Sequence, residues 1–254
     1  MIFHTFGNKN NQSIILIHGL LTPWQIWEKQ ISVLQEKYYV IIPALDGHIE
    51  EHASEYISVE NEAEQIEKYI SEELNGSVYA LCGLSMGGVI ANRIYERNKV
   101  TVDNLVLDGA PLIKIPSVSN KFMTNAYKNI IHRSKSRDRK TLKNFKRDFL
   151  PEKFLANYLK FADTMSDSSI ENMVDSVCTS ELTPRNNTEN TKILFLHGTK
   201  GNEIYSKKTA NKMKQYYPDI TIKCFKGYKH AELAIYKPDE WIKAVVSFLR
   251  ADWL

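Results

Sequence analysis

Residues 77–88 of the chain read SVYALCGLSMGG, and this stretch decides the fold. It begins with an apolar run typical of a buried strand and ends in the pattern Gly-x-Ser-x-Gly, centred on Ser85. Apolar residues recur at helical spacing directly afterwards. A chain that turns this sharply from strand to helix holds its serine at the tip of a strained turn, where side chains larger than glycine would clash on either side. The stretch therefore predicts an accessible Ser85 hydroxyl, with the Met86 N–H at the helix N-terminus ready to stabilise an oxyanion.

A second oxyanion donor is expected in the loop after the predicted strand 13–18. That loop reads HGLLTPW over residues 18–24. Gly19 lets the backbone approach a ligand closely, so the Leu20 N–H is the predicted second donor of the oxyanion hole. His18 is interpreted as a hydrogen-bonding residue that braces the loop. Trp24 has two interpretations, because it either lines the substrate pocket or covers the following helix.

His230 is the predicted general base. A serine hydroxyl is a weak nucleophile until a base takes its proton, and that base needs an acid to fix its tautomer. His230 lies in the segment GYKHAE, residues 227–232, just after the last predicted strand. A glycine-containing loop in this position is able to bring an imidazole over the sheet edge toward Ser85. The other six histidines fit this position less well.

The rest of the chain predicts an α/β fold with a mostly parallel sheet flanked by helices. Apolar, β-branched runs alternate with amphipathic helical patterns, as expected for parallel strands covered on both faces. Seven such runs are predicted strands: residues 1–6, 13–18, 39–43, 77–82, 104–107, 192–197 and 221–225.

The alternation of strands and helices stops between residues 111 and 190. This stretch has helical periodicity only, so it is predicted to be an all-helical cap, or lid, over the carboxyl ends of the strands, where ligands bind in open α/β folds. The expected organisation is a core made of residues 1–110 and 191–254, with the cap subdomain at 111–190. The polar segment 186–190 is the expected linker back to the core.

Composition excludes several other classes of protein. A content of 43% apolar and 25% charged residues in 254 residues is typical of a globular protein. No apolar run approaches the ~18 residues of a membrane span, and the first residues lack the pattern of a secretory signal. Three dispersed cysteines predict neither a disulfide framework nor a metal site. The expected location is cytoplasmic.

Positive charge is concentrated between Lys128 and Arg147, where nine Lys or Arg residues accompany a single acid, Asp138. Two interpretations remain. The run is either a solvated helical surface, or it attracts a negatively charged partner, which is an anionic substrate or an acidic surface. No nucleic-acid-binding motif accompanies the run, so no nucleic-acid partner is predicted. The sequence does not reveal an oligomeric state.

Taken together, residues 18–19, 83–88 and 229–231 resemble the motifs of serine hydrolases of the α/β-hydrolase-fold superfamily. The segments PALDGH at 43–48 and LDGAP at 107–111 also resemble loops of that family. The resemblance implies an eight-stranded, mostly parallel sheet, here reduced at its front. It also implies a helical cap inserted after the strand that follows the nucleophile-elbow strand. The implied chemistry is two-step acyl transfer through a Ser85 acyl-enzyme, with no metal or organic cofactor.

The acid of the triad departs from the family pattern. The family usually has a glycine after the penultimate strand, followed three residues later by aspartate, whereas here Gly198 is followed at that place by Gly201. Glu203 comes two positions later, and its extra methylene group and a longer loop make it the favoured acid. Asp108, at the end of the strand after the elbow, is the alternative, because some family members place the acid there.

The predicted function is a serine esterase that cleaves a small-molecule carboxylic ester or thioester. Two alternatives remain open at this stage. A carbon–carbon hydrolase or lyase of the same fold would act on an anionic substrate suited to the basic cap. A non-catalytic ligand-binding pseudoenzyme is suggested by the missing aspartate at position 201.

Overall fold

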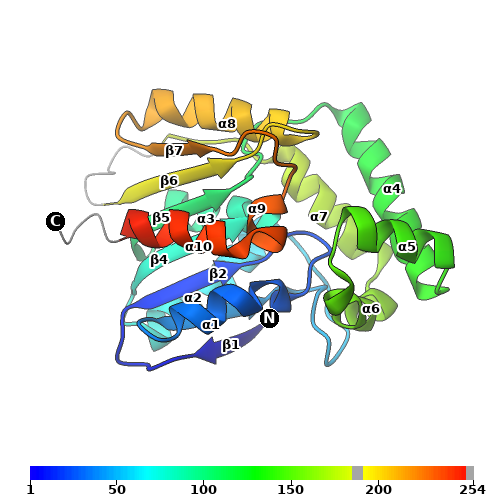
Figure 1. Cartoon of the computed structure of the whole chain (residues 1–254), viewed down its shortest axis with the longest axis horizontal. Coiled ribbons are helices and arrows are strands. Elements are labelled where there is room, and N and C mark those ends of the chain that lie inside the picture. Colours follow the sequence, from blue (N-terminus) through cyan, green and yellow to red (C-terminus); the bar gives the residue numbers. More distant parts are fainter. Residues whose placement is uncertain (185–190, 250–254) are drawn as a thin grey trace.

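The computed structural model of the protein describes residues 1–184 and 191–249. Within these residues seven strands form one sheet in the order β1-β3-β2-β4-β5-β6-β7 (Figure 1). Only β1 runs antiparallel to its neighbour, and all other pairs are parallel. The strands are β1 Ile2–Phe6, β2 Ser13–Ile17, β3 Tyr39–Ala44, β4 Ser77–Leu84, β5 Thr101–Asp108, β6 Lys192–His197 and β7 Thr221–Cys224.

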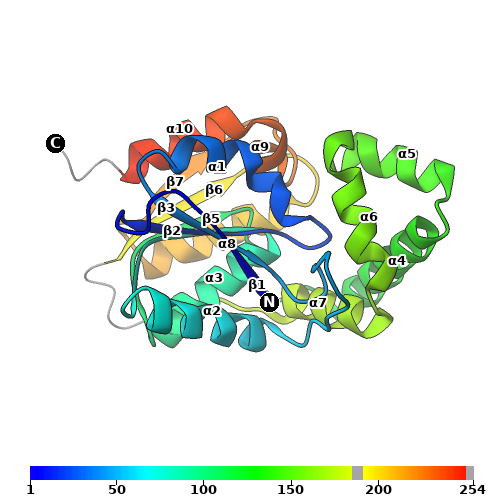
Figure 2. The same ribbon diagram turned by 90° about the horizontal axis from the view of Figure 1, so that it is seen from below.

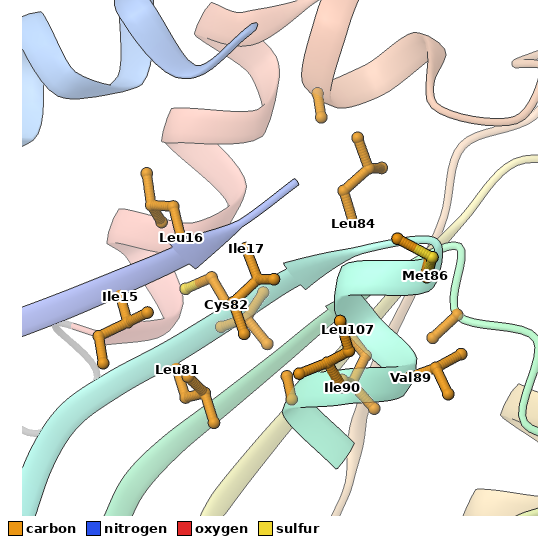
Figure 3. Close-up of a cluster of buried hydrophobic side chains, with 14 of the residues drawn as sticks. Ile15, Leu16, Ile17, Leu81, Cys82, Leu84, Met86, Val89, Ile90 and Leu107 are labelled. Atoms are coloured by element: carbon orange, nitrogen blue, oxygen red, sulfur yellow. The ribbon is translucent and has the colours of Figure 1, made fainter. Parts of the chain in front are cut away.

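The centre of the sheet is buried on both faces. Every residue of β2 and β3 is buried, as is most of β4, which fits their continuous apolar sequences because helices cover both faces of a parallel sheet. In Figure 2, α1 (Glu28–Leu34) and α10 (Pro238–Leu249) lie on one face, and α2 (Val59–Glu73) and α3 (Met86–Arg97) on the other. Side chains of β2, β4, β5 and α3 meet in one apolar cluster (Figure 3).

The predicted fold class is confirmed, with small differences at strand ends. Each of the seven runs predicted to be strands contains a strand of the sheet in the described residues. The sheet thus has seven strands, one fewer than the eight that the family resemblance implied. β5 begins at Thr101, three residues before the predicted start, because Ser77 and Val78 of β4 pair with Thr101 and Val102. Its exposed Thr101 and Asp103 alternate with buried residues, which hid this end of the strand in a search for apolar runs.

Only helices lie between β5 and β6 in the described residues. They are α4 Ser117–Lys135, α5 Arg139–Asp148, the short 3-10 turn η2 Glu152–Phe154, α6 Leu155–Thr164 and α7 Asp167–Thr179. Figure 1 shows them grouped beyond the carboxyl ends of the strands, as the sequence predicted for an all-helical insertion. The predicted linker 186–190 and the chain end 250–254 lie outside the described residues. Among the helices that the structure describes, none is long and apolar enough to cross a membrane.

The helical insertion has its own aromatic packing. Tyr158 stacks on Phe145 at 4.2 Å between ring centroids and meets Phe161 edge-on at 5.5 Å. The Tyr158 hydroxyl donates a hydrogen bond to Ser134 Oγ over 2.9 Å. Since these side chains come from α4, α5 and α6, their contacts hold three of the inserted helices together.

Four of the nine basic residues of the run form ion pairs within the described part of the insertion. Arg137 makes a two-pronged ion pair with Asp163, both contacts at 2.7 Å. Lys128 pairs with Asp167 and Glu171, and other basic residues of the run pair in the same way: Lys146 with Glu152 and Arg147 with Asp148. These contacts favour the interpretation of the run as a solvated, ion-paired surface.

The cluster of Figure 3 makes a direct prediction about stability. Leu81 of β4 is completely buried there, so Leu81→Ala should lower the free energy of unfolding by about 2–5 kcal/mol through lost contacts and a residual cavity. Val33→Ala on α1, where the side chain is 38% exposed, should change it by less than about 0.5 kcal/mol. Urea denaturation of the two variants tests this, and equal effects would contradict the assigned packing.

Candidate active site

Ser85 occupies the predicted sharp turn between β4 and α3. Its backbone has φ 53° and ψ −114°, a conformation that residues other than glycine rarely adopt. A Cβ atom on Gly83 would lie 2.2 Å from the Gly87 carbonyl oxygen, and one on Gly87 would lie 2.4 Å from the carbonyl oxygen of Ile17 in β2. The turn therefore requires both glycines, as the pattern Gly-x-Ser-x-Gly predicted.

Ser85, His230 and Glu203 are joined by hydrogen bonds. Ser85 Oγ lies 2.8 Å from His230 Nε2, and His230 Nδ1 lies 2.5 Å from Glu203 Oε1. A carboxylate only accepts, so the imidazole carries its proton on Nδ1 and presents a bare Nε2 to the serine hydroxyl. This arrangement leaves His230 able to take a proton from Ser85.

His230 reaches this position because the backbone beneath it carries no side chain. The residue below is Gly109, with φ 64°, and a Cβ there would lie 3.0 Å from His230 Cε1 and 3.3 Å from Glu203 Oε1. His230 itself precedes Ala231, whose φ of 62° turns the chain into α9 (Glu232–Tyr236). The strand ends β5, β6 and β7 thus supply the loops that surround the imidazole.

Glu203 is held as a buried, ionised acid. It is the first residue of α8 (Glu203–Tyr216), is 1% exposed, and its Oε2 accepts a hydrogen bond of 2.7 Å from the Gly198 N–H. Burial alone would raise the pKa of Glu203, but the hydrogen bonds from His230 and from the Gly198 N–H bring this pKa below its usual value. A helix N-terminus also favours a negative charge.

Asp108, the alternative acid, is placed differently. It ends β5 and is buried, and no hydrogen bond joins it to His230 in the described residues. Burial, reinforced by the neighbouring Glu203 charge, raises its pKa well above the usual value, so the protonated form of this carboxyl is favoured. Of the two acids named from the sequence, Glu203 is hydrogen-bonded to the imidazole and Asp108 is not.

The two predicted oxyanion donors border the same serine. Met86 is the first residue of α3, and Leu20 lines the cavity above Ser85. A Cβ on Gly19 would lie 3.4 Å from Ser85 Cβ, so the loop that carries Leu20 packs directly against the serine. Within the described residues neither the Leu20 N–H nor the Met86 N–H donates to another protein group. Both are therefore available to an oxygen at Ser85.

Two buried histidines brace the oxyanion loop. His18 Nδ1 donates to the Gly19 carbonyl over 3.0 Å, and its Nε2 accepts from the Leu45 N–H over 3.2 Å. His48 Nε2 accepts from the Leu21 N–H over 3.0 Å. The sequence predicted the bracing role of His18 but not that of His48, although His48 ends the family-like segment 43–48. Each ring needs one bare nitrogen, so both must remain neutral.

A cavity of about 380 Å³ opens above Ser85 and His230. The helical insertion supplies an apolar part of its wall, with Met123, Tyr127, Val174 and Val177. Polar and charged residues lie near the catalytic loops, among them Lys200 and Lys229. In the described part of the chain no group of His, Cys, Asp or Glu side chains is arranged to hold a metal ion.

Trp24 does not line this cavity, so the interpretation of it as a substrate contact is corrected. Its ring stacks on His4 at 4.1 Å between centroids and lies 6.0 Å from Phe6. Pro23 begins a 3-10 turn, η1 (Trp24–Trp27), which packs the indole beside β1. Trp24 therefore covers the edge of the sheet.

A mostly parallel sheet with a serine on a strand-to-helix turn, followed by a histidine loop after the last strand, is the architecture of an α/β hydrolase. A family model of the alpha/beta hydrolase fold matches residues 12–146, more than half of the chain. The chain belongs to the α/β hydrolase fold family.

Individual relatives are distant. A pimeloyl-[acyl-carrier protein] methyl ester esterase of Legionella pneumophila is 28% identical over 151 residues, which are 57% of this chain and 58% of the relative. The chain spans less than two thirds of the length of the curated relatives it matches.

Solved structures share the fold over nearly the whole chain. An alpha/beta hydrolase family protein from Desulfitobacterium hafniense superposes with a TM-score of 0.78 at 21% identity, covering 98% of this chain and 100% of that one. A structure described with carboxylesterases of Nitrososphaera gargenis has a TM-score of 0.75 at 17% identity, covering 98% and 93%. At these identities the likeness concerns the fold alone.

The buried His18 predicts a pH-dependent stability. Burial lowers its pKa from 6.5 to about 4. Between these two pH values His18 binds a proton in the unfolded chain but not in the folded protein. The contribution of His18 to the free energy of unfolding should be complete above pH 6.5. Protonation of His18 alone should lower this free energy by about 3 kcal/mol toward pH 4.

Urea titrations at pH 7.5 and pH 4 measure this loss. His18→Asn, which keeps a donor near Nδ1 but cannot titrate, should remove most of the His18 share of the pH dependence. His52→Gln, at an exposed histidine, is the matched control and should keep the wild-type slope. The same slope in His18→Asn and wild type would contradict the assignment.

Proposed function

We propose that the protein is a serine hydrolase that cleaves a small-molecule carboxylic ester or thioester through an acyl-enzyme on Ser85. The observation that carries this proposal is the hydrogen-bonded chain Ser85–His230–Glu203 at the floor of a partly apolar cavity. Membership of the α/β hydrolase family supports a hydrolase. The relative from Legionella, which is named as a methyl ester esterase, supports ester cleavage.

In the first step, Ser85 Oγ attacks the acyl carbon while its proton passes to His230 Nε2, 2.8 Å away. The resulting imidazolium is stabilised by Glu203, which accepts from Nδ1 at 2.5 Å. The carbonyl oxygen becomes an oxyanion and accepts hydrogen bonds from the Leu20 and Met86 N–H groups. His230 then gives the proton to the leaving oxygen or sulfur, and the acyl group remains on Ser85.

In the second step, water replaces the leaving group. His230 Nε2 takes a proton from the water as its oxygen attacks the acyl carbon, and the same two N–H groups stabilise the second oxyanion. Return of the proton to Ser85 Oγ releases the carboxylic acid and restores the starting state. These steps need no redox partner, since one water is consumed and one bond is cleaved.

We also propose the division into a core of residues 1–110 and 191–254 and a cap of residues 111–190. Residues of α4 and α7 in the insertion line the cavity with apolar side chains. An apolar wall beside a serine suits the acyl chain of a substrate, because burial of each CH₂ group is worth about 0.8 kcal/mol. The proposed cap thus sets which acyl groups bind.

Removal of the nucleophile is the direct test. Ser85→Ala should reduce hydrolysis of 4-nitrophenyl butyrate by a factor of about 10³ or more, whereas Ser32→Ala, at an exposed serine of α1, should retain wild-type rates. A fluorophosphonate probe should label wild type and Ser32→Ala but not Ser85→Ala. Absence of labelling in folded wild type would favour a non-catalytic binding protein.

The two carboxyl groups can be distinguished by isosteric variants. Glu203→Gln should reduce kcat by about 10³-fold or more, because an amide no longer stabilises the imidazolium or fixes its tautomer. Asp108→Asn should change kcat by less than about threefold, since Glu203 and not Asp108 is hydrogen-bonded to His230 Nδ1. Stopped-flow or steady-state assays of both variants measure this. A larger loss of kcat in Asp108→Asn than in Glu203→Gln would assign the role of the triad acid to Asp108.

A further inference from the structure

We propose that Lys200 and Lys229 select substrates whose leaving group carries a negative charge, such as a carboxylate or phosphate on the alcohol or thiol. This inference rests on the proposed function and specifies its substrate class. Both lysines line the cavity that opens above Ser85, and both side chains are exposed.

The two lysines belong to loops that are tied together. Lys229 immediately precedes His230, and Lys200 lies three residues before Glu203. The backbone N–H groups of Thr199 and Lys200 both donate to the Tyr228 carbonyl oxygen over 3.0 Å. Because Tyr228 is the chain neighbour of Lys229, these bonds hold together the two loops that carry the lysines into the lining of the cavity.

Their charges are not cancelled by neighbouring acids. Within the described residues neither ammonium group lies within 4.0 Å of a carboxylate. Asp148 also lines the cavity and feels the Lys229 charge, but its carboxylate is occupied by Arg147 at 2.9 and 2.5 Å.

Two other acids of these loops are also engaged elsewhere. Glu232 accepts from the Lys229 backbone N–H over 2.8 Å, and Glu203 binds His230 and Gly198. The Arg147–Asp148 pair contributes no net charge. The residues that line the cavity therefore leave two unpaired positive charges at this side of it.

The mechanism decides which end of the substrate meets these charges. His230 Nε2 must protonate the leaving oxygen or sulfur, so the leaving group lies on the His230 side of the cavity. The acyl chain then points toward the apolar wall formed by Met123, Val174 and Val177. Positive charge on one side and apolar surface on the other predict an apolar acyl group joined to an anionic alcohol or thiol.

Lysine suits this task because a compact ammonium group on a flexible stem attracts carboxylate and phosphate groups of different shape. At an exposed position its attraction is modest and is screened by salt. Two such charges at the mouth also raise the encounter rate of an anionic substrate. The expected signature is thus a salt-sensitive preference in kcat/KM.

The test uses three butyrate or glutarate esters. The first is 4-(butyryloxy)benzoate, with an anionic leaving group, and the second is its methyl ester, in which a neutral methoxycarbonyl group replaces the carboxylate. The third is mono-4-nitrophenyl glutarate, whose negative charge lies on the acyl side. Each is assayed with wild type, Lys200→Gln/Lys229→Gln and the control Lys37→Gln/Lys68→Gln, which removes the same charge from two exposed lysines that do not line the cavity.

In Lys200→Gln/Lys229→Gln, kcat/KM for 4-(butyryloxy)benzoate should fall by roughly five- to tenfold, while the methyl ester changes by less than about twofold. The control variant should keep the wild-type ratio of the two esters, and 0.5 M NaCl should abolish most of the difference. An unchanged ratio in the Lys200/Lys229 variant overturns the proposal. A selective loss with the glutarate ester in place of the benzoate also overturns it, because the lysines would then face the acyl group.

Failure of the proposed function looks different. In that case wild type would hydrolyse none of the three esters in a Ser85-dependent manner, and the Ser85→Ala comparison would be flat. If hydrolysis depends on Ser85 but not on the two lysines, the proposed serine hydrolase activity stands and only the proposed preference for an anionic leaving group is wrong.

Discussion

The close packing of the β4–α3 turn against β2 is the constraint on which the site depends. Gly83 lets the end of β4 pack against the first turn of α3, and Gly87 lets that turn approach the end of β2, so closely that an added Cβ at either position would clash with backbone. The same packing forces Ser85 into a left-handed conformation and leaves the Met86 N–H at the start of α3. Strain stored in one residue is offset by the buried apolar cluster around it, which includes ten labelled side chains in Figure 3.

Burial acts on the ionisable groups of the site in opposite ways, depending on their partners. Glu203 is buried with an imidazole and a backbone N–H, and it stays charged. Asp108 is buried beside that charge without such partners, and its pKa is raised well above the usual value. His18 and His48 are buried against backbone groups that need a bare ring nitrogen, so they remain neutral as well. The same loss of solvation thus accompanies a lowered pKa in one acid, a raised pKa in the other, and two neutral hydrogen-bonding rings.

The helical insertion and the catalytic loops form a cavity with two kinds of wall. Apolar side chains from α4 and α7 lie on one part, and the loops after β6 and β7 bring polar groups and two lysines to another. Four of the nine basic residues that stood out in the sequence pair with acids of the insertion. The less conspicuous Lys200 and Lys229 line the cavity, which charge clustering along the chain did not reveal.

The sequence by itself determined the fold class, the serine turn and the histidine loop, because these depend on local patterns: apolar runs, two glycines around Ser85 and a loop after the last strand. It also named Leu20, Met86 and both acids. Only the tertiary structure brought Glu203 and not Asp108 to His230, placed Trp24 away from the cavity and bonded His48 to the loop that carries Leu20. Those outcomes depend on distances between residues far apart in the chain, which strand order and helix packing fix and which no local pattern encodes.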